Sequence, residues 1–190
     1  MSHESNSQAE LATMLNRLGA ATAAPDAAAI CAGVKNVLMQ ELSQVAVPAA
    51  FLQPVTTGYA RRCLYKDPKG RFSVVVMVWA PGQGTPLHDH AGHWCVECVY
   101  GGKIRVRSFE REAEDSGRIC FRECQSVVSG IGAAGALIPP HEYHSIDNPF
   151  DTPAVTIHVY EGEITWCNAF EPLAEAGWFQ PERHELAYTV

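Results

Sequence analysis

The sequence is poor in basic residues and has no long apolar run. Its 14 Lys and Arg are outnumbered by 21 Asp and Glu, and no dense Lys/Arg segment offsets the formal net charge of −7. No apolar stretch approaches the roughly 20 residues that cross a membrane. Residues 1–10 lack the basic-then-apolar pattern of a secretory leader. We therefore expect a cytoplasmic protein with no membrane or nucleic-acid partner, whose ligand is a small molecule.

The number and spacing of the cysteines do not indicate a disulfide framework. The seven cysteines are an odd number and no secretory leader precedes them, so we expect reduced thiols. Cys95 and Cys98 form one C-x-x-C, but there is no second pair and no helix begins there. This motif alone is a weak indication of a zinc or dithiol site.

The character of the chain changes near Pro48. Residues 1–47 carry apolar side chains at three- and four-residue spacing, which predicts helices over 9–18 and 27–42, the second beginning near Pro25-Asp26. Residues 48–190 contain short β-branched and aromatic stretches between turn residues, a pattern typical of an all-β sandwich or barrel. We expect one domain, a β-barrel with an N-terminal helical annex. The expected strands cover 60–65, 72–79, 93–100, 103–110, 117–123, 135–138, 144–148 and 154–160.

Three histidines give the most informative pattern. His88 and His90 are two residues apart in a stretch expected to be extended, so both side chains project from one strand face. His144 follows on a later strand and can complete a facial set of three nitrogen donors. Imidazole suits Fe, Zn, Cu and Ni, and three such donors leave coordination positions open for chemistry. The alternative is a pair of surface histidines in a turn, with no metal.

Two motifs around these histidines resemble those of the cupin superfamily, in the right order. The resemblance implies a cupin fold, a small jelly-roll-type β-barrel. In the first motif, Cys95 stands where most cupins place a glutamate ligand. The matching positions are Gly82-x5-His88-x-His90-x4-Cys95-x6-Gly102 for the first motif, and Pro139, His144 and Asn148 for the second.

The missing glutamate matters for the charge of the centre. A cation held by three neutral imidazoles keeps its full positive charge and favours an anionic ligand, and a substrate thiolate suits iron. Glu97, two residues beyond Cys95, is the alternative fourth ligand. Because its offset from His90 exceeds the cupin spacing, we favour a structural or outer role for Glu97. Asp89 is expected to point away from its flanking histidines as a hydrogen-bonded turn carboxylate.

A closer resemblance covers roughly Gly58–Phe170. The chain resembles the cysteine dioxygenase family of thiol dioxygenases, which oxidise cysteine to cysteine sulfinate with dioxygen at a mononuclear non-haem Fe(II) held by three histidines. This resemblance implies that the chain binds Fe(II) through three histidines. It also implies that the small molecules the chain acts on are a thiol, cysteine, and dioxygen. The implied ligands are His88, His90 and His144. The segments that carry the resemblance are Tyr59-Ala60-Arg61, His88-Asp89-His90 with Cys95, His144, Thr156–Tyr160 and Cys167–Phe170.

The resemblance also implies roles for residues around the metal. Arg61, with Tyr59 beside it, would hold the substrate carboxylate, a task that suits the two-pronged guanidinium. Thr156, His158 and Tyr160 alternate on one strand face and would form a hydrogen-bonded row ending over the iron. A tyrosine hydroxyl there can donate to an oxygen species and polarise it. Without the resemblance, Arg61 would be taken for a solvated strand residue and the row for core packing.

The role of Cys95 stays open in the sequence. In part of the family the matching cysteine forms a thioether with the active-site tyrosine, here Tyr160. Many bacterial members have glycine at that position and no crosslink. Trp94 and the pair Glu161-Gly162 depart from the pattern of the crosslinked animal enzymes. Both states of Cys95 therefore remain as alternatives.

The identity of Arg61 favours cysteine as the substrate, because a glutamine commonly occupies this position in the related 3-mercaptopropionate dioxygenases. Three other functions remain possible from the sequence. One is a dioxygenase for another small thiol, such as 3-mercaptopropionate or cysteamine. A second is a cupin isomerase or lyase that uses Zn, Ni or Mn with Glu97 as fourth ligand. The third is a cupin that binds a small molecule without turnover.

Overall fold

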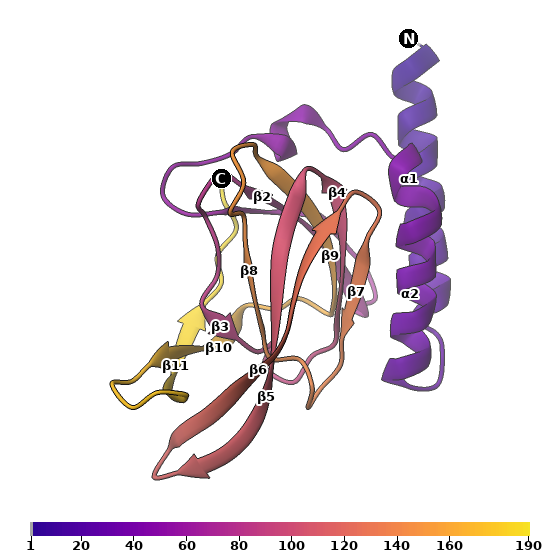
Figure 1. The fold of residues 1–190 in the computed structure, drawn as a ribbon. Helices are drawn as coiled ribbons and strands as arrows, with labels where there is room; N and C mark the ends of the chain where they lie inside the picture. The colour runs from indigo at the N-terminus through magenta and orange to yellow at the C-terminus, as the bar shows by residue number, and fades with distance from the viewer. Residues whose placement is uncertain (1) are drawn as a thin grey trace.

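The computed structural model describes residues 2–190, with side chains from residue 8 onward. Two N-terminal helices precede a body of β-strands (Figure 1). The helices are α1 (Ser2–Ala21) and α2 (Ala27–Glu41), followed by the 3-10 helices η1 (Leu42–Gln44) and η2 (Ala49–Leu52). The strands are β1 (Ala60–Lys66), β2 (Phe72–Trp79), β3 (Leu87–His88), β4 (Cys95–Gly101), β5 (Lys103–Asp115), β6 (Arg118–Gly130), β7 (Ala134–Leu137), β8 (His144–Asp147), β9 (Ala154–Glu161), β10 (Trp166–Pro172) and β11 (Trp178–Glu185).

The strands form two antiparallel groups. Five of them make a sheet in the order β1-β2-β9-β4-β7, in which β9 is central and pairs with β2 on one side and β4 on the other. The remaining strands pair in a closed ring in the order β10-β11-β6-β5-β8-β3. This ring places β3 beside β8 and β10, although the three strands are far apart in the sequence.

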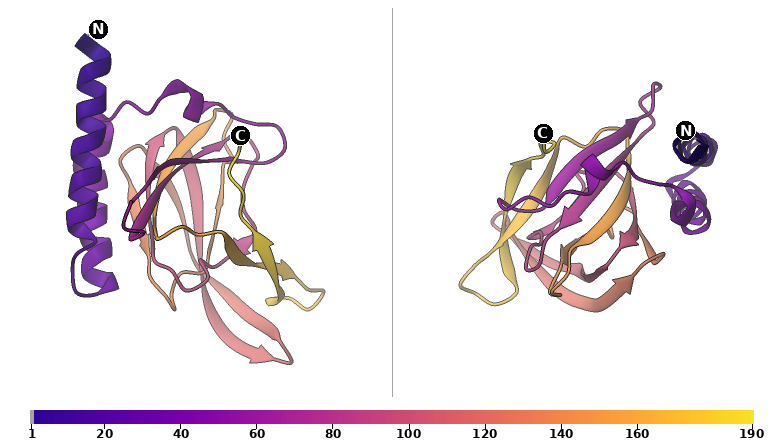
Figure 2. Two further views of the ribbon diagram at one scale, coloured as in Figure 1. Left: turned by 180° about the vertical axis from the view of Figure 1, so that it is seen from behind. Right: turned by 90° about the horizontal axis from the view of Figure 1, so that it is seen from above.

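The two helices pack together on the outer face of the five-stranded sheet (Figure 2). Leu18 of α1 and Leu38 of α2 belong to the same buried cluster as Val76 of β2. The expected start of α2 is confirmed, since the Asp26 side chain accepts a hydrogen bond from the Ala29 N–H at 2.8 Å. No helix within residues 2–190 is long and apolar enough to cross a membrane.

Strand β2 is buried along its whole length because both of its faces are covered. Val74 and Val76 lie against the helices, whereas Val75, Met77 and Trp79 face the interior between the two strand groups. The uninterrupted apolar run of β2 follows from this two-sided burial. The interior face of the same sheet, with β9 at its centre, is the surface that carries the candidate site.

The expected all-β body with N-terminal helices agrees with the structure, and every expected strand has a counterpart within a few residues at its start. Two strands, β10 and β11, are not predicted by the sequence, and β3 is shorter than the extended stretch expected around His88 and His90. β3 has two residues, and β10 and β11 carry Asn, Glu, Pro and Gln instead of an alternating β-branched pattern. Their extended shape comes from strand pairing more than from local preference, so their own residues do not signal it.

The seven cysteines are free thiols in the described chain, in line with the expected reduced state. Cys95 faces the interior cluster, whereas Cys98 belongs to the cluster beneath the helices. The two thiols of the C-x-x-C motif therefore lie on opposite faces of β4. They do not form the paired donors that a zinc or dithiol site requires.

Gly102 joins β4 to β5 and provides a test of this packing. Its φ is +72°, and a Cβ built there would lie 2.6 Å from the Pro153 carbonyl oxygen. Gly117 has a similar φ of +79° but no atom within 4 Å of the same position. We expect Gly117→Ala to lower the free energy of unfolding by about 1 kcal/mol through backbone strain alone. Gly102→Ala should lower it by roughly 1–3 kcal/mol more, because of the added clash. Urea unfolding measures both losses, and equal losses would contradict the packing described.

Candidate metal centre

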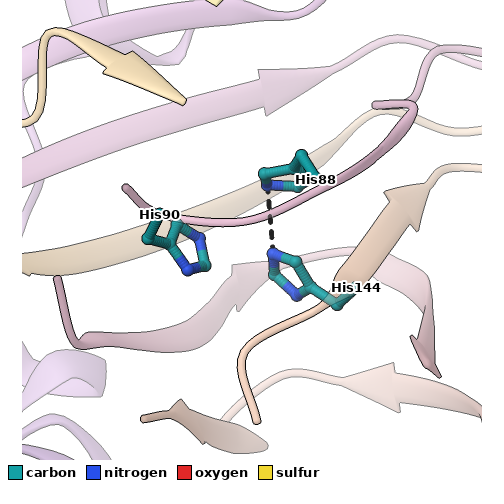
Figure 3. Close-up of side chains that lie close together, drawn as sticks. All are labelled: His88, His90 and His144. Atoms are coloured by element: carbon teal, nitrogen blue, oxygen red, sulfur yellow. Dashed lines mark hydrogen bonds between the residues drawn. The ribbon is translucent and has the colours of Figure 1, made fainter. Parts of the chain in front are cut away.

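Three imidazoles meet where β3 pairs with β8 (Figure 3). His88 and His144 are opposite each other across this pairing, and their Nε2 atoms are 3.1 Å apart. The His90 ring centroid lies 5.3 Å from that of His88 and 5.0 Å from that of His144. Each residue offers one ring nitrogen, and these atoms all lie within 4.8 Å of one another. The structure thus brings together the three histidines singled out in the sequence.

The local chain path of His90 differs from the expectation. β3 ends at His88, so the prediction that both histidines sit within one strand is wrong for His90. The Asp89 N–H still donates to the Asn168 carbonyl at 3.1 Å, which holds this stretch beside β10. The Asp89 carboxylate accepts hydrogen bonds from the backbone of Ala91 and from both the backbone and side chain of Asn168. Asp89 is therefore the hydrogen-bonded turn carboxylate that we expected.

The arrangement of the imidazoles fits a bound cation. A separation of 3.1 Å between Nε2 atoms is close to that of two adjacent nitrogen ligands that each lie about 2.1 Å from one metal. His88 Nδ1 lies 3.1 Å from the Pro86 carbonyl, which places the hydrogen on Nδ1 and leaves the Nε2 lone pair free. Within residues 2–190, the buried Nδ1 atoms of His90 and His144 have no hydrogen-bond partner. The fit to a cation therefore rests on the Nε2 atoms of His88 and His144 and on the His88 tautomer, and not on these two Nδ1 atoms.

The charge state of the buried histidines also favours metal binding. Burial lowers the pKa of His90 and of His144 well below the ordinary value, and the neighbouring histidines lower it further. Burial lowers the pKa of the half-buried His88 as well. All three imidazoles are consequently neutral at neutral pH, which is the form that binds metals.

Glu97 is not one of the grouped metal-ligating side chains. Its Oε2 atom lies 3.8 Å from Nδ1 of His158 instead. Among the described residues, the group that could hold a metal contains three histidines and no carboxylate. The alternative in which Glu97 is a fourth ligand is therefore wrong for this arrangement, and the outer role that we favoured for Glu97 agrees with it.

A small cavity of about 50 Å³ opens beside the three histidines. Arg61 and Tyr160 line it from the five-stranded sheet, and His184 and Leu186 line it from β11 and the chain that follows. Tyr59 stacks on Trp79 in the same wall, with ring centroids 4.6 Å apart. Pockets for drug-sized ligands measure roughly 300–1,000 Å³, so this cavity suits a much smaller molecule.

Arg61 is a buried cation at the wall of this cavity, with only 3% of its surface exposed. Its Nη2 donates to the Ile164 carbonyl at 2.9 Å, and its guanidinium lies 4.6 Å from the Tyr188 ring centroid. Its Nε and Nη1 have no hydrogen-bond partner among residues 2–190. A buried guanidinium with two unused donors is costly unless an anion completes it. The interpretation of Arg61 as a solvated strand residue is therefore wrong.

A continuous hydrogen-bonded row follows the interior face of β9. Trp79 Nε1 donates to Thr156 Oγ1 at 2.9 Å, and Thr156 Oγ1 lies 2.8 Å from His158 Nε2. His158 Nδ1 lies 3.4 Å from the Tyr160 hydroxyl. The Tyr160 ring centroid is 5.8 Å from that of His90, so the row ends beside the histidine trio. Burial lowers the pKa of His158 to about 3, with smaller effects from His88 and Arg61.

Cys95 lies directly beside this row. It is the register partner of Tyr160 across the β4–β9 pairing, and its Sγ is 3.9 Å from His158 Nδ1. A thioether between Cys95 and Tyr160 would therefore need no change of strand register. Burial raises the pKa of the Cys95 thiol well above its usual range, and nearby Glu97 raises it further. The unreacted thiol is thus neutral.

The sequence reasoning missed several residues that shape the site. Trp79 is one of them, since its indole N–H anchors the row through Thr156. Tyr188 covers the Arg61 guanidinium, and the Thr189 N–H donates to the Arg61 carbonyl at 2.7 Å. Trp79 stands in the apolar run of β2, so no local pattern marks its N–H as a donor to Thr156. No local pattern indicates that Tyr188 and Thr189 contact Arg61, because this contact depends on the chain after β11 passing beside β1.

Three histidines beside a small cavity in a β-protein could hold a metal ion and leave coordination positions open. The family model of cysteine dioxygenase type I matches residues 7–172, and the chain belongs to this family. Cysteine dioxygenase type 1 of Rattus norvegicus and of Homo sapiens are each 24% identical over 119 residues, covering 58% of this chain and 54% of the relative. The chain thus spans about half the length of the curated relatives it matches.

Two of the solved structures that match this chain have sequence identities of 18% or less. The protein TT1209 from Thermus thermophilus gives a TM-score of 0.48 at 18% identity, covering 62% of this chain and 96% of that chain. An uncharacterized conserved protein with a double-stranded beta-helix domain from Klebsiella pneumoniae gives a TM-score of 0.49 at 17% identity, covering 64% and 93%.

The histidine trio should bind one metal ion per chain. We expect His144→Ala to lose the ion after loading and desalting, because two imidazoles cannot hold it as three do. His141→Ala is the matched control, since His141 is exposed and three residues away. Elemental analysis by mass spectrometry measures the metal in each variant. Equal metal content in the two variants would contradict the assignment of the centre.

Proposed function

We propose that this chain is a cupin-type, Fe(II)-dependent thiol dioxygenase that oxidises L-cysteine with dioxygen to cysteine sulfinic acid. One observation carries the proposal beyond family membership. The buried Arg61, with two unused donors, shares a small cavity with a three-histidine centre that lacks a carboxylate. Such a site favours a small molecule that brings a thiolate for the metal and a carboxylate for the arginine.

In this proposal His88, His90 and His144 hold the iron. Because all three donors are neutral, the centre keeps its positive charge and attracts the substrate thiolate. Iron would supply dioxygen activation, the part of the chemistry that protein side chains cannot perform. The protein contributes orientation, exclusion of water and control of protons.

Arg61 binds the substrate carboxylate through Nε or Nη1, the two donors without a partner in the described chain. The Ile164 carbonyl and the Tyr188 ring keep the guanidinium in place before substrate arrives, so little ordering is needed on binding. Tyr59, stacked on Trp79, forms the adjacent wall. The substrate is thus held at its carboxylate and at its sulfur, which fixes the sulfur beside the metal.

Tyr160 acts at the reacting end of the row. Its hydroxyl is held by His158, and His158 is held by Thr156, so the phenol cannot rotate freely. Burial keeps the Tyr160 hydroxyl protonated by raising its pKa well above the usual value. A fixed, protonated hydroxyl can donate a hydrogen bond to oxygen as negative charge develops there. Cys95 packs beside the phenol as its strand partner and limits its movement.

Anaerobic loading with Fe(II), followed by cysteine and oxygenated buffer, tests the function directly. We expect oxygen uptake matched by formation of cysteine sulfinic acid, identified by mass spectrometry. Cysteamine lacks a carboxylate and should be a poor substrate, because Arg61 would stay unpaired. Faster turnover of 3-mercaptopropionate than of cysteine would favour the related thiol dioxygenase. If the iron-loaded protein consumed no oxygen with any of these thiols, the proposal would be refuted.

Arg61→Ala should raise KM for cysteine by roughly 10²- to 10³-fold, as expected for losing a charged hydrogen-bonding pair worth about 3–4 kcal/mol. The iron content should stay unchanged, because Arg61 is not among the grouped ligands. Arg62→Ala is the control, since Arg62 donates to the Phe51 and Gln53 carbonyls outside the cavity. Steady-state oxygen uptake measures the KM values. A KM in Arg61→Ala equal to that of the control would remove Arg61 from substrate binding.

A further inference from the structure

A second, larger cavity of about 440 Å³ lies on the other side of the β9 row. It is lined by β4, β7 and β9 on one side and by β5 and β6 on the other. Thr156 and Glu97 line this cavity but not the cavity of the metal centre, so the residues of the row separate the two spaces. The second cavity thus reaches the back of the row.

Glu97 is a buried carboxyl group between this cavity and the row. Only 5% of its surface is exposed, and its Oε2 has no hydrogen-bond partner in the described chain. The strand opposite it has a glycine, and a Cβ at Gly135 would lie 3.6 Å from Glu97 Oε1. Burial raises the pKa of Glu97 to about 7. The group can therefore gain and lose a proton near neutral pH.

His158 Nδ1 connects Glu97 to the metal-centre cavity. Glu97 and His158 are register partners across the β4–β9 pairing. Nδ1 lies 3.4 Å from the Tyr160 hydroxyl and 3.8 Å from Glu97 Oε2. The second distance exceeds a hydrogen bond, but such contacts commonly tighten when substrate binds. Because Thr156 Oγ1 accepts from Trp79, its hydroxyl donates to His158 Nε2, and the ring hydrogen of His158 is on Nδ1. A carboxylate at Glu97 can take this hydrogen. Nδ1 can then accept the proton of the Tyr160 hydroxyl, which the proton of the substrate thiol replaces.

Few other charged groups face Glu97. On its own strand, the neutral Cys95 thiol is the nearest ionisable neighbour along the interior face. From β9 it faces His158, whose pKa is lowered further by His88 and Arg61. From α2, Lys35 lines the second cavity. The lining from β5, β6 and β7 is uncharged: Ile104, Val106, Ser108, Gln125, Val127, Ser129, Ala134, Gly135, Ala136 and Leu137.

The proposed reaction releases one proton per turnover. A cysteine thiol and dioxygen give a sulfinate and a proton, as sulfur loses four electrons and dioxygen gains them. Both oxygen atoms end on sulfur, and the proton comes from the thiol. The metal-centre cavity is small and would be filled by substrate, so the proton needs another way out.

We propose that Glu97 is a positioning residue that takes this proton from His158 and passes it to solvent through the second cavity. The inference rests on the proposed function. The carboxylate form of Glu97 accepts the hydrogen of His158 Nδ1, which frees this nitrogen for the next proton. Glu97 thus acts through His158 and touches neither the metal nor the substrate.

The pH dependence of kcat with cysteine tests this role. In the iron-loaded wild type, kcat should rise with pH through an ionisation near 7, as Glu97 becomes a carboxylate. Glu97→Gln should abolish this ionisation and lower kcat at pH 8 by roughly 10- to 100-fold. Glu97→Asp keeps the carboxylate and should restore a pH-dependent rise. Ser129→Ala, in the wall of the same cavity, is the control and should follow the wild-type profile.

A purely structural role for Glu97 would lower thermal stability in Glu97→Gln but leave the ionisation in place. An unchanged ionisation in Glu97→Gln would therefore overturn the proposal, whatever its stability.

A measurement without turnover separates this inference from the proposed function. In zinc-loaded protein with ¹³C-labelled glutamate, the Glu97 carboxyl signal is identified by its loss in Glu97→Gln. We expect it to titrate near pH 7, and at higher pH in His158→Phe, because the carboxylate then loses its donor. Titration near the ordinary glutamate value of about 4.3, or no response to His158→Phe, would overturn the link. These results are decisive even if no thiol is oxidised.

Discussion

The pairing of His88 with His144 across β3 and β8 is the constraint on which the site depends. β3 is only two residues long, and it also pairs with β10, so it closes the ring of strands. The same contact that closes the ring therefore sets the two Nε2 atoms 3.1 Å apart. One strand pairing therefore closes the ring and also sets the geometry of the metal site. A change that loosened this pairing would lose both.

The charged groups of the interior are divided between the two sides of the β9 row. Three neutral imidazoles, two of them buried, and a buried guanidinium line one small cavity, and no carboxylate belongs to the metal group in the described chain. Asp89 also lines this cavity, and its carboxylate accepts hydrogen bonds from Ala91 and Asn168. Glu97, a buried carboxyl behind the row, has its pKa raised to about 7 by burial. Positive charge thus gathers on the substrate side, and the group able to take up protons lies on the other side. A small dianionic ligand, with thiolate and carboxylate, complements this distribution.

Much of this site could be predicted from the sequence because its residues lie at fixed strand periods. The alternation of Thr156, His158 and Tyr160 predicts one face of one strand, and the structure has that face in a continuous row. Residues whose role depends on which distant segments of the chain meet could not be predicted. Tyr188 lies 127 positions from Arg61 in the sequence and covers its guanidinium only because the chain after β11 passes beside β1. Trp79 stood in an apolar run, where nothing local indicates that its N–H has a polar partner.

The position of β9 explains why one strand carries so much of the chemistry. As the central strand, it is paired on both sides, so its backbone is fixed and its side chains cannot shift register. Its interior residues then touch groups on both neighbours: Trp79 from β2, and Cys95 and Glu97 from β4. The outer face of the sheet packs against the helices, which shield it from water. The N-terminal helices therefore serve the site indirectly, since they allow the strand that bears the row to be buried on both faces.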